Sequence, residues 1–321
     1  MRDAQDSEPA LAAPALVAEG LVRRFAKNEA VRGVSFSVAR GELYGLVGPD
    51  GAGKTTTLRM LAGLVRPTSG TVRVIGIDPF GKGSAKVRDV LGLVPQEHSL
   101  YGDLSIEENL DFFRSLYGLS SGDYKTRRAR LLDITRLGPF LSRRASQLSG
   151  GMYKKLALSC ALLHQPEVLL LDEPTNGVDP VSRRELWELI YEFVEQGMCV
   201  VVSTPYMDEA ARCHRVALVH AGRVLREGAP AALVRDFVGT SAEITGGDRE
   251  ALHALVATLP EIVAASPAGA KLRVVIAPGA QASVAARVAA LGAELVSSPP
   301  DFEDLFLFEI AAATHAEAKA A

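Results

Sequence analysis

The hydrophobic positions of this chain form short continuous runs that alternate with stretches of helical spacing. The clearest runs are ELYGLV at residues 42–47, VLLL at residues 168–171 and CVVVS at residues 199–203. Continuous apolar runs of this length indicate strands covered on both faces, as in a parallel sheet. Helical spacing follows two of them, at residues 55–64 and 180–196. The pattern predicts an α/β core. Further strands are expected at residues 15–22, 34–38, 71–75 and 91–94.

Between Ser105 and about His164 the hydrophobic period becomes helical and the strand signals stop. We therefore expect a helical subdomain of about residues 97–165, inserted into the α/β core. Afterwards the strand pattern resumes, with a short helix at residues 206–212. A hairpin, residues 216–220 and 223–225, should turn at Ala221-Gly222.

A fresh pattern, richer in alanine, begins after about Gly239. It indicates a small α+β domain over residues 241–310. Its expected strands lie near residue 244 and at 272–276 and 294–296, and its expected helices at 249–259, 282–291 and 302–309. Residues 15–240 would form the first domain, with residues 1–14 as a disordered leader and 311–321 as a tail.

Composition and charge argue against several classes of protein function. The 321 residues are 48% hydrophobic and carry a formal net charge of −3, so the basic excess of a general nucleic-acid binder is missing. The run KTRRAR at residues 125–130 indicates a solvated helix face. The three cysteines have no metal-site spacing and are expected to be reduced thiols near the core. We find neither a membrane-spanning apolar run nor the pattern of a signal peptide.

The first motif that indicates a chemical function is GPDGAGKTT. It follows the strand expected at residues 42–47 and fits the phosphate-loop pattern G-x-x-x-x-G-K-[ST]. Glycines let backbone N–H groups point at phosphate oxygens, and the next helix presents its positive end. A lysine can reach the β- and γ-phosphates, and a hydroxyl can bind Mg²⁺. The predicted ATP-binding residues are Gly48, Pro49, Asp50, Gly51, Ala52, Gly53, Lys54, Thr55 and Thr56.

Two carboxylates end the buried run VLLLDEP. Asp172 is expected to hold Mg²⁺, as in P-loop NTPases generally. Glu173 is expected to act as general base on the attacking water, a contribution of about 10²–10⁴-fold in rate. The alternative for this pair is an ordinary solvated strand end.

The stretch QLSGGM then identifies a family resemblance. From about residue 16 to 235 the sequence resembles the ATP-binding subunits of ABC transporters, whose signature loop matches Leu148, Ser149, Gly150 and Gly151. Met152 stands where that family most often has glutamine. The resemblance implies a P-loop NTPase fold and a head-to-tail dimer, in which this loop acts on the ATP of the partner subunit.

Other roles follow from the same resemblance. Gln96 matches the glutamine that touches Mg²⁺ and senses the γ-phosphate, with Lys54 and Glu173 as the other catalytic residues. Asp179 matches a loop that crosses the dimer interface. Phe25 is placed like the aromatic that stacks on adenine, although alone it would equally suit a core aromatic. Magnesium would be held by Thr55, Gln96 and Asp172.

The resemblance also implies partners. Residues 97–110 lie where family members contact their membrane subunit, and SPPDFEDLFLFEI near the C-terminus is similar to the tail of drug- and antibiotic-export ATPases. We expect a cytoplasmic ATPase subunit, peripheral on the inner face of the cell membrane. It would pair with a polytopic permease and a second ATP-binding subunit, identical or not, and not with nucleic acid. The alternatives are a soluble ABC ATPase of translation or DNA maintenance, and a regulatory module that hydrolyses ATP weakly.

One departure stands out in STPYMDEA, residues 203–210. Pro205 occupies the place of the family's histidine, which donates to the γ-phosphate. Losing one donor aimed at transition-state charge costs typically about 10²–10³ in kcat. Locally, Thr204 as N-cap and Pro205 at the first helical position predict a well-formed helix start.

Overall fold

The structure, a computed structural model, describes residues 13–26, 28–97 and 99–320. Almost all of the expected leader therefore lies outside the described residues. Tertiary contacts group the chain into two units, one up to residue 205 together with 221–223, the other comprising residues 206–220 and 224 onward.

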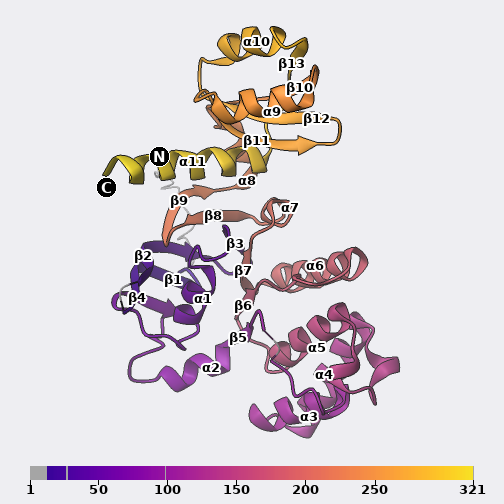
Figure 1. Cartoon of the computed structure of the whole chain (residues 1–321). Coiled ribbons are helices and arrows are strands. Elements are labelled where there is room, and N and C mark those ends of the chain that lie inside the picture. The colour runs from indigo at the N-terminus through magenta and orange to yellow at the C-terminus, as the bar shows by residue number, and fades with distance from the viewer. Residues whose placement is uncertain (1–12, 27, 98, 321) are drawn as a thin grey trace, which may run out of the picture. The chain divides into compact units, whose positions relative to one another are not determined.

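The first unit contains a parallel sheet, an antiparallel sheet and a block of helices (Figure 1). In chain order its elements are β1 (Leu16–Phe25), β2 (Asn28–Val38), β3 (Leu43–Val47), α1 (Lys54–Leu61), β4 (Ser69–Val74), α2 (Val87–Val90), β5 (Leu91–Val94), α3 (Ile106–Leu116), α4 (Ser121–Thr135), α5 (Gly150–Leu162), β6 (Val168–Asp172), α6 (Pro180–Glu195) and β7 (Cys199–Thr204).

The parallel strands lie in the order β5-β6-β7-β3. Every residue of β3, β6 and β7 is buried, as their continuous apolar runs predict, because neighbouring elements cover both faces. Leu171 pairs with Val202 and Val47 with Thr204, so these strands end at one edge of the sheet. Ligands of parallel α/β sheets bind at the carboxyl ends of the strands.

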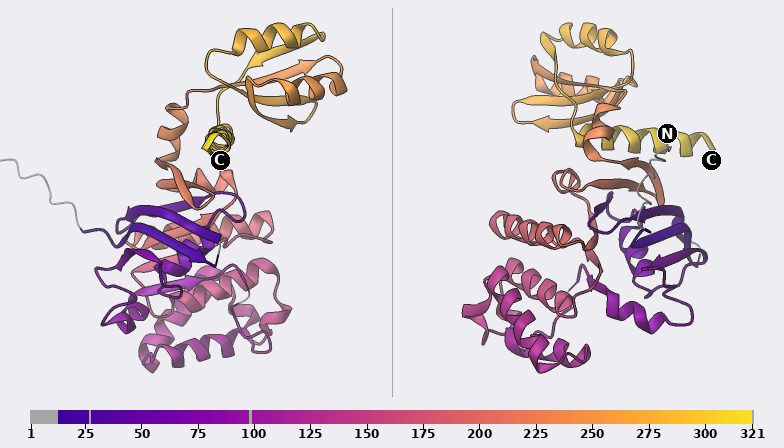
Figure 2. Two further views of the ribbon diagram at one scale, coloured as in Figure 1. Left: turned by 60° about the vertical axis from the view of Figure 1, so that its left-hand side comes forward. Right: turned by 180° about the vertical axis from the view of Figure 1, so that it is seen from behind.

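The predicted helical block is confirmed, with α3, α4 and α5 gathered together (Figure 2). A capping box opens α3: the Ser105 hydroxyl accepts from the Glu108 N–H, and the Glu108 carboxylate accepts from the Ser105 N–H. Pro180 is the first residue of α6, as expected, and the structure adds Asp179 as its N-cap.

The second unit ends in a small α+β fold. Its elements are α7 (Met207–Ala210), β8 (Arg215–His220), β9 (Arg223–Gly228), α8 (Pro230–Arg235), β10 (Thr240–Gly246), α9 (Arg249–Thr258), β11 (Ile262–Ala268), β12 (Lys271–Ile276), α10 (Gln281–Ala289), β13 (Ala293–Ser297) and α11 (Phe302–Ala320).

The elements β10 to β13 form a split βαβ fold. They follow the order βαββαβ along the chain, and the sheet has the order β11-β12-β10-β13 with antiparallel pairing. Leu252 of α9 and Val284 and Val288 of α10 share one apolar core with the inner residues of the sheet. Both helices therefore cover the same face (Figure 1).

Two local expectations were wrong. β11 was missed, because its alanines and Pro267 carry little strand signal. α11 continues as helix to Ala320, in the segment from residue 311 where a frayed helix or a tail was expected, since alanine is the best helix former. Thr204 does not cap a helix: it is the last buried residue of β7, and α7 begins at Met207 with Tyr206 as its N-cap.

Candidate nucleotide-binding site

The predicted phosphate loop joins the buried strand β3 to the first turn of α1. Gly53, just before the helix, has φ +102°, and a Cβ there would lie 2.5 Å from the main-chain oxygen of Ala30. Only glycine fits this position without moving the backbone. The loop therefore curls tightly enough to present its N–H groups at a helix N-terminus, the arrangement that binds phosphate.

Lys54 is buried within this loop. Its Nζ donates to the main-chain oxygens of Gly48 and Pro49, at 2.8 and 3.1 Å, and lies 3.4 Å from Oε1 of Glu173. Buried charges in proteins are paired because desolvation is costly. An incoming phosphate would compete with Glu173 for this ammonium group.

Asp172 ends β6 beside the loop. Its Oδ1 accepts hydrogen bonds from the hydroxyls of Thr55, at 3.0 Å, and Ser203, at 2.6 Å. A carboxylate and a hydroxyl are oxygen ligands of the kind that Mg²⁺ takes together with substrate phosphates. The side chains of the predicted metal pair, Thr55 and Asp172, are therefore in direct contact.

Glu173 follows Asp172 with left-handed backbone geometry, φ +46°, and its carboxylate has other partners than that of Asp172. Such a conformation is rare for a non-glycine residue and is held here by surrounding hydrogen bonds. The Glu173 N–H donates to the Ser203 hydroxyl at 3.1 Å. The carboxylate accepts from the side-chain amide of Gln96, with 2.7 Å between Gln96 Nε2 and Glu173 Oε2. Gln96 and Glu173, 77 residues apart, thus meet at the loop that holds Lys54.

Lys54, Thr55, Gln96 and Glu173 line one cavity of about 420 Å³, whereas Asp172, Gly48 and Pro49 are not part of its lining. The predicted residues that line it are Phe25, Asp50, Gly51, Ala52, Gly53, Lys54, Thr55, Thr56, Gln96 and Glu173. Phe25 is 43% exposed at its rim, with the guanidinium of Arg23 4.4 Å from its ring centre. Sequence reasoning missed Asn28 and Ala30, which also line the cavity and belong to no motif.

The LSGG residues line a different cavity. Ser149 caps α5, accepting from the Met152 N–H at 3.3 Å, and Gly151 packs so closely that a Cβ would lie 2.3 Å from Cβ of Ser182. Leu148 and Gly150 line a space of about 290 Å³ that also includes Gln96. Ser149 and Gly150 are exposed at the start of a helix. The structure therefore leaves this loop accessible to another molecule.

Two further residues singled out in the sequence, Asp179 and Pro205, lie next to the ends of secondary-structure elements. Both main-chain hydrogen bonds that Asp179 accepts, from Val181 and Ser182 at 3.1 and 3.0 Å, serve the start of α6 and lower the pKa of its carboxyl. Pro205 follows β7 directly, and the oxygen of the preceding residue, Thr204, accepts from the N–H of Gly48 at 3.2 Å. The proline therefore adjoins the phosphate loop but carries no donor.

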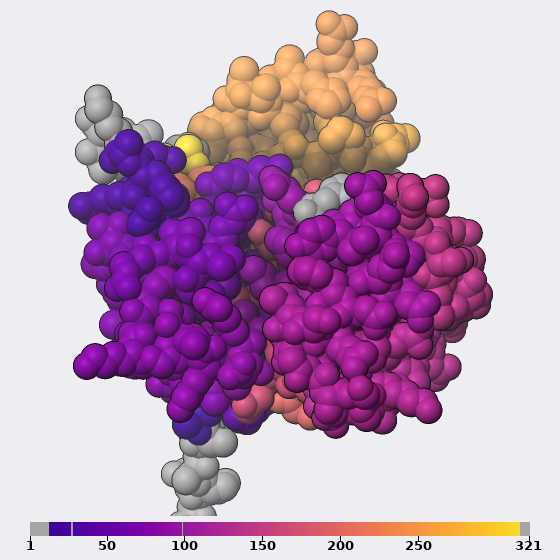
Figure 3. Space-filling model, turned by 90° about the horizontal axis from the view of Figure 1, so that it is seen from below, coloured from indigo at the N-terminus to yellow at the C-terminus, as the bar shows by residue number. Residues whose placement is uncertain are grey.

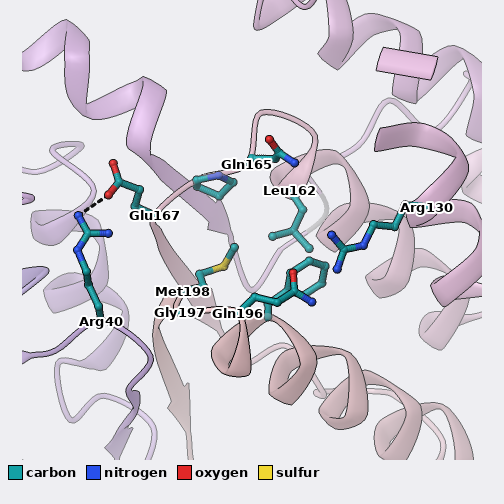
Figure 4. Close-up of a pocket in the computed structure, with 10 residues that line it drawn as sticks. Arg40, Arg130, Leu162, Gln165, Glu167, Gln196, Gly197 and Met198 are labelled. Carbon is teal, nitrogen blue, oxygen red and sulfur yellow. Dashed lines mark ion pairs between the residues drawn. The ribbon is translucent and has the colours of Figure 1, made fainter. Parts of the chain in front are cut away.

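A further cavity, of about 220 Å³, lies at the opposite ends of the parallel strands (Figure 4). Glu167 and Met198, which precede β6 and β7, line it, and the Arg40–Glu167 ion pair spans one side. Its other cation, Arg130, is paired with Glu192 at 3.1 Å. None of the predicted site residues lies there, and its charges already have partners.

Figure 3 shows the surface formed by the violet residues of the first unit and the magenta residues of its helical block, which lie side by side. Among the described residues, no helix is both long and apolar enough to cross a bilayer.

All three cysteines are free and buried, as expected, and burial raises the pKa of Cys199 and of Cys213 to about 12. The part of the chain that the structure describes holds no cluster of three or more His, Cys, Asp or Glu side chains able to bind a metal ion.

Comparisons with known proteins agree with this geometry. Residues 31–176 match the family model described as "ABC transporter". The chain is 44% identical over 262 residues to the Escherichia coli protein named "Probable multidrug ABC transporter ATP-binding protein YbhF", covering 80% of this chain but only 45% of that relative. It is 41% identical over 241 residues to the "Nod factor export ATP-binding protein I" of Paraburkholderia xenovorans, covering 74% of this chain and 79% of the relative.

A solved structure titled "Structure of ATP binding subunit of ABC transporter" superposes with a TM-score of 0.64 at 32% identity. The alignment covers 70% of this chain and 93% of that one. The predicted α/β fold of the P-loop NTPase class is therefore confirmed, together with the resemblance drawn from LSGG.

Proposed function

Because this chain belongs to the family of ABC transporter ATP-binding proteins, we propose that it binds and hydrolyses ATP to energise an ABC exporter through a separate transmembrane subunit. The relatives named for multidrug transport and Nod factor export support export as the direction. The chain spans less than half of the first of these relatives, so its partners are inferred from its own surface and site.

The observation that carries the proposal is one cavity lined by the phosphate loop, Gln96 and Glu173, with the Asp172 carboxylate in contact with the lining residue Thr55. Lys54 and the loop N–H groups can hold phosphates, and Glu173 is placed to take a proton from water. Gln96 reaches the same carboxylate and can orient it. Asp179 belongs to the dimer contact in this proposal, and Phe25, exposed at the cavity with Arg23 over one face of its ring, would stack on adenine.

Magnesium fits the donor set. Thr55, Asp172 and Gln96 offer oxygens beside the loop, and Thr55 and Asp172 are already in contact at 3.0 Å. When bound there, the ion would neutralise charge on the β- and γ-phosphates. The Ser203 hydroxyl donates to the same oxygen of Asp172 that Thr55 contacts, and this bond holds the carboxylate in place.

A second ATP-binding subunit completes each site in this proposal. Ser149 and Gly150 are exposed and lie outside the lining of the 420 Å³ cavity, so they are available to the nucleotide of a partner. The subunit would sit on the cytoplasmic face of the membrane.

The face for the permease lies around α3. Tyr101, Phe112 and Leu116 are 52%, 36% and 63% exposed, and the rings of Tyr101 and Phe112 meet edge to face at 4.6 Å. Exposed aromatic and aliphatic side chains gathered together are typical of a protein contact.

Affinity purification of the full chain from detergent-solubilised cells tests the proposal. A polytopic membrane protein should co-purify, and Leu116→Asp should reduce its recovery. The matched control is Val238→Asp, since Val238 is similarly exposed, at 59%, but distant in sequence. Recovery with ribosomes or DNA in place of a membrane protein would contradict the proposal. A purified complex without any ATPase activity would favour a regulatory module, or a partner subunit that supplies the competent site.

A further inference from the structure

Helix α5, which begins at the LSGG loop, carries two neighbouring buried lysines with different partners. Lys155 pairs with Glu185 of α6. Lys154 reaches the opposite way, and its Nζ donates to the main-chain oxygen of Gln96 at 3.1 Å. The two residues are 8% and 9% exposed, so burial alone does not distinguish them.

The buried position of the Lys154 ammonium group has a cost in desolvation free energy. The side chain lines a small apolar space with Val94, Leu158 and Leu171. Burial lowers the pKa of Lys154, while the negative charges of Asp172 and Glu173 act in the opposite direction. Methionine would fill the same apolar space without this desolvation cost. The positive charge therefore calls for a role other than packing.

The contacts of α5 supply that role. Lys154 holds the carbonyl of Gln96, and the side-chain amide of Gln96 donates to Glu173 at 2.7 Å. One residue earlier, the hydroxyl of Tyr153 accepts from the N–H of Leu100 at 2.8 Å. Consecutive side chains of one helix thus hold the backbone of Gln96 and of Leu100.

We propose that Lys154 is a positioning residue that couples the signature helix α5 to the general base Glu173 through Gln96. A shift of α5 moves the carbonyl of Gln96, and the carboxamide then moves relative to the carboxylate that it orients. The inference rests on the proposed function and adds a route by which contact at the LSGG loop regulates hydrolysis.

The first test compares Lys154→Met with the matched control Lys155→Met in the full chain. For Lys154→Met we expect kcat to fall on the order of 10- to 100-fold, as for a misplaced catalytic group, while KM for ATP is unchanged. Lys154→Arg should restore turnover, since it keeps the charge and the donor. Lys155→Met should keep kcat, and thermal unfolding midpoints show whether each variant is folded. Equal kcat for wild type and folded Lys154→Met would overturn the proposal.

The second test asks whether Lys154 acts through Gln96. In a Gln96→Ala background, Lys154→Met should add no further loss, because the carboxamide that it positions is gone. A full additional loss would mean that Lys154 acts on Glu173 or Asp172 directly, which contradicts the proposal.

Backbone hydrogen exchange gives a readout that needs no turnover. Exchange at the backbone amides of Gln96 and Glu97 should rise in Lys154→Met and stay at the wild-type rate in Lys155→Met; unchanged exchange in both would count against the coupling. If wild-type protein shows no ATPase activity, the proposed function fails, whereas the exchange experiment still decides the role of Lys154.

Discussion

Glu173 is held by groups that ATP binding must rearrange. Lys54 lies 3.4 Å from one carboxylate oxygen, and Gln96 donates to the other. A triphosphate brings more negative charge to Lys54 than one carboxylate does, so it should draw the lysine away. The glutamate would then be free to act on water, with Gln96 as the remaining guide.

Replacing Glu173 by glutamine tests its role as base. Glu173→Gln should lower turnover by about 10²–10⁴-fold or more, because an amide cannot take the proton, while ATP binding remains. Phosphate release and equilibrium binding of a fluorescent ATP analogue measure the two effects. Glu188→Gln, at an exposed position of α6, serves as control. Unchanged turnover would remove Glu173 from the mechanism.

Pro205 is the second residue with a direct prediction. Pro205→His should raise kcat or leave it unchanged, with an upper gain of about 10²–10³-fold if the new imidazole reaches the developing charge. Pro205→Ala separates the two causes, since it removes the ring but adds no donor. An equal rise in both variants would assign the effect to the backbone, and a fall in Pro205→His would contradict the prediction.

At the scale of elements, a buried cluster fixes α11 to the split βαβ sheet. Asp304, in the first turn of α11, is buried and accepts from the hydroxyl of Ser241 on β10 at 2.8 Å. The guanidinium of Arg273 on β12 donates to both of its oxygens, through Nε at 2.9 Å and through a terminal nitrogen. Arg226 of β9 pairs with Glu309, also on α11, at 2.7 Å. The sequence SPPDFEDLFLFEI therefore encodes a docked helix.

The cluster gives a stability prediction with a pH dependence. Burial raises the pKa of Asp304, but the hydrogen bonds from Arg273, Asp301 and Ser241 outweigh it, so the net pKa is lowered. The ionised form thus stabilises the fold. This contribution is complete above the usual aspartate pKa of about 3.9 and is lost as pH falls through the lowered value.

Asp304→Asn should therefore lower the free energy of unfolding by about 1–3 kcal/mol at neutral pH, and the difference from wild type should shrink under acid. Native-state hydrogen exchange of β10 and β12 amides measures it. Glu243→Gln is the control, because its pair with Lys271 is on the exposed surface and contributes little. A difference that grows as the pH falls would contradict the assignment.

At the scale of the whole molecule, Ser149 and Gly150 of the LSGG loop lie outside the lining of the 420 Å³ cavity that contains the phosphate loop. We therefore expect two chains to form each complete ATP site. Lys54→Ala should disable a chain as ATP holder, and Ser149→Arg should disable it as donor of the signature loop. Each variant alone should be inactive. Mixing them should restore turnover, because the intact phosphate loop of one chain then meets the intact LSGG loop of the other.

This complementation is measured by comparing phosphate release from the mixture with phosphate release from each variant alone at the same total protein concentration. Wild type mixed with Lys54→Ala controls for simple dilution. Mixtures as inactive as the separate variants would mean that LSGG acts within its own chain. The predicted domains, 15–240 and 241–310, also belong to this scale and stay a prediction.

The sequence alone determined the strand runs of the parallel sheet, the helical block and the phosphate loop, because these depend on local period and on fixed spacing along the chain. It also placed Asp172 and Glu173 at the end of a buried strand. Neighbouring lysines at 154 and 155 look alike in sequence, and only tertiary packing sends one to Gln96 and the other to Glu185.

Tertiary structure also decided the features with weak local signals. β11 is a strand because β12 pairs with it, and Thr204 stays extended because it pairs with Val47 inside the sheet. Asn28 and Ala30 reach the cavity only because β2 folds back beside the loop. Such contacts join residues far apart in the chain, and their free energy comes from burial and pairing that no local pattern of residue types encodes.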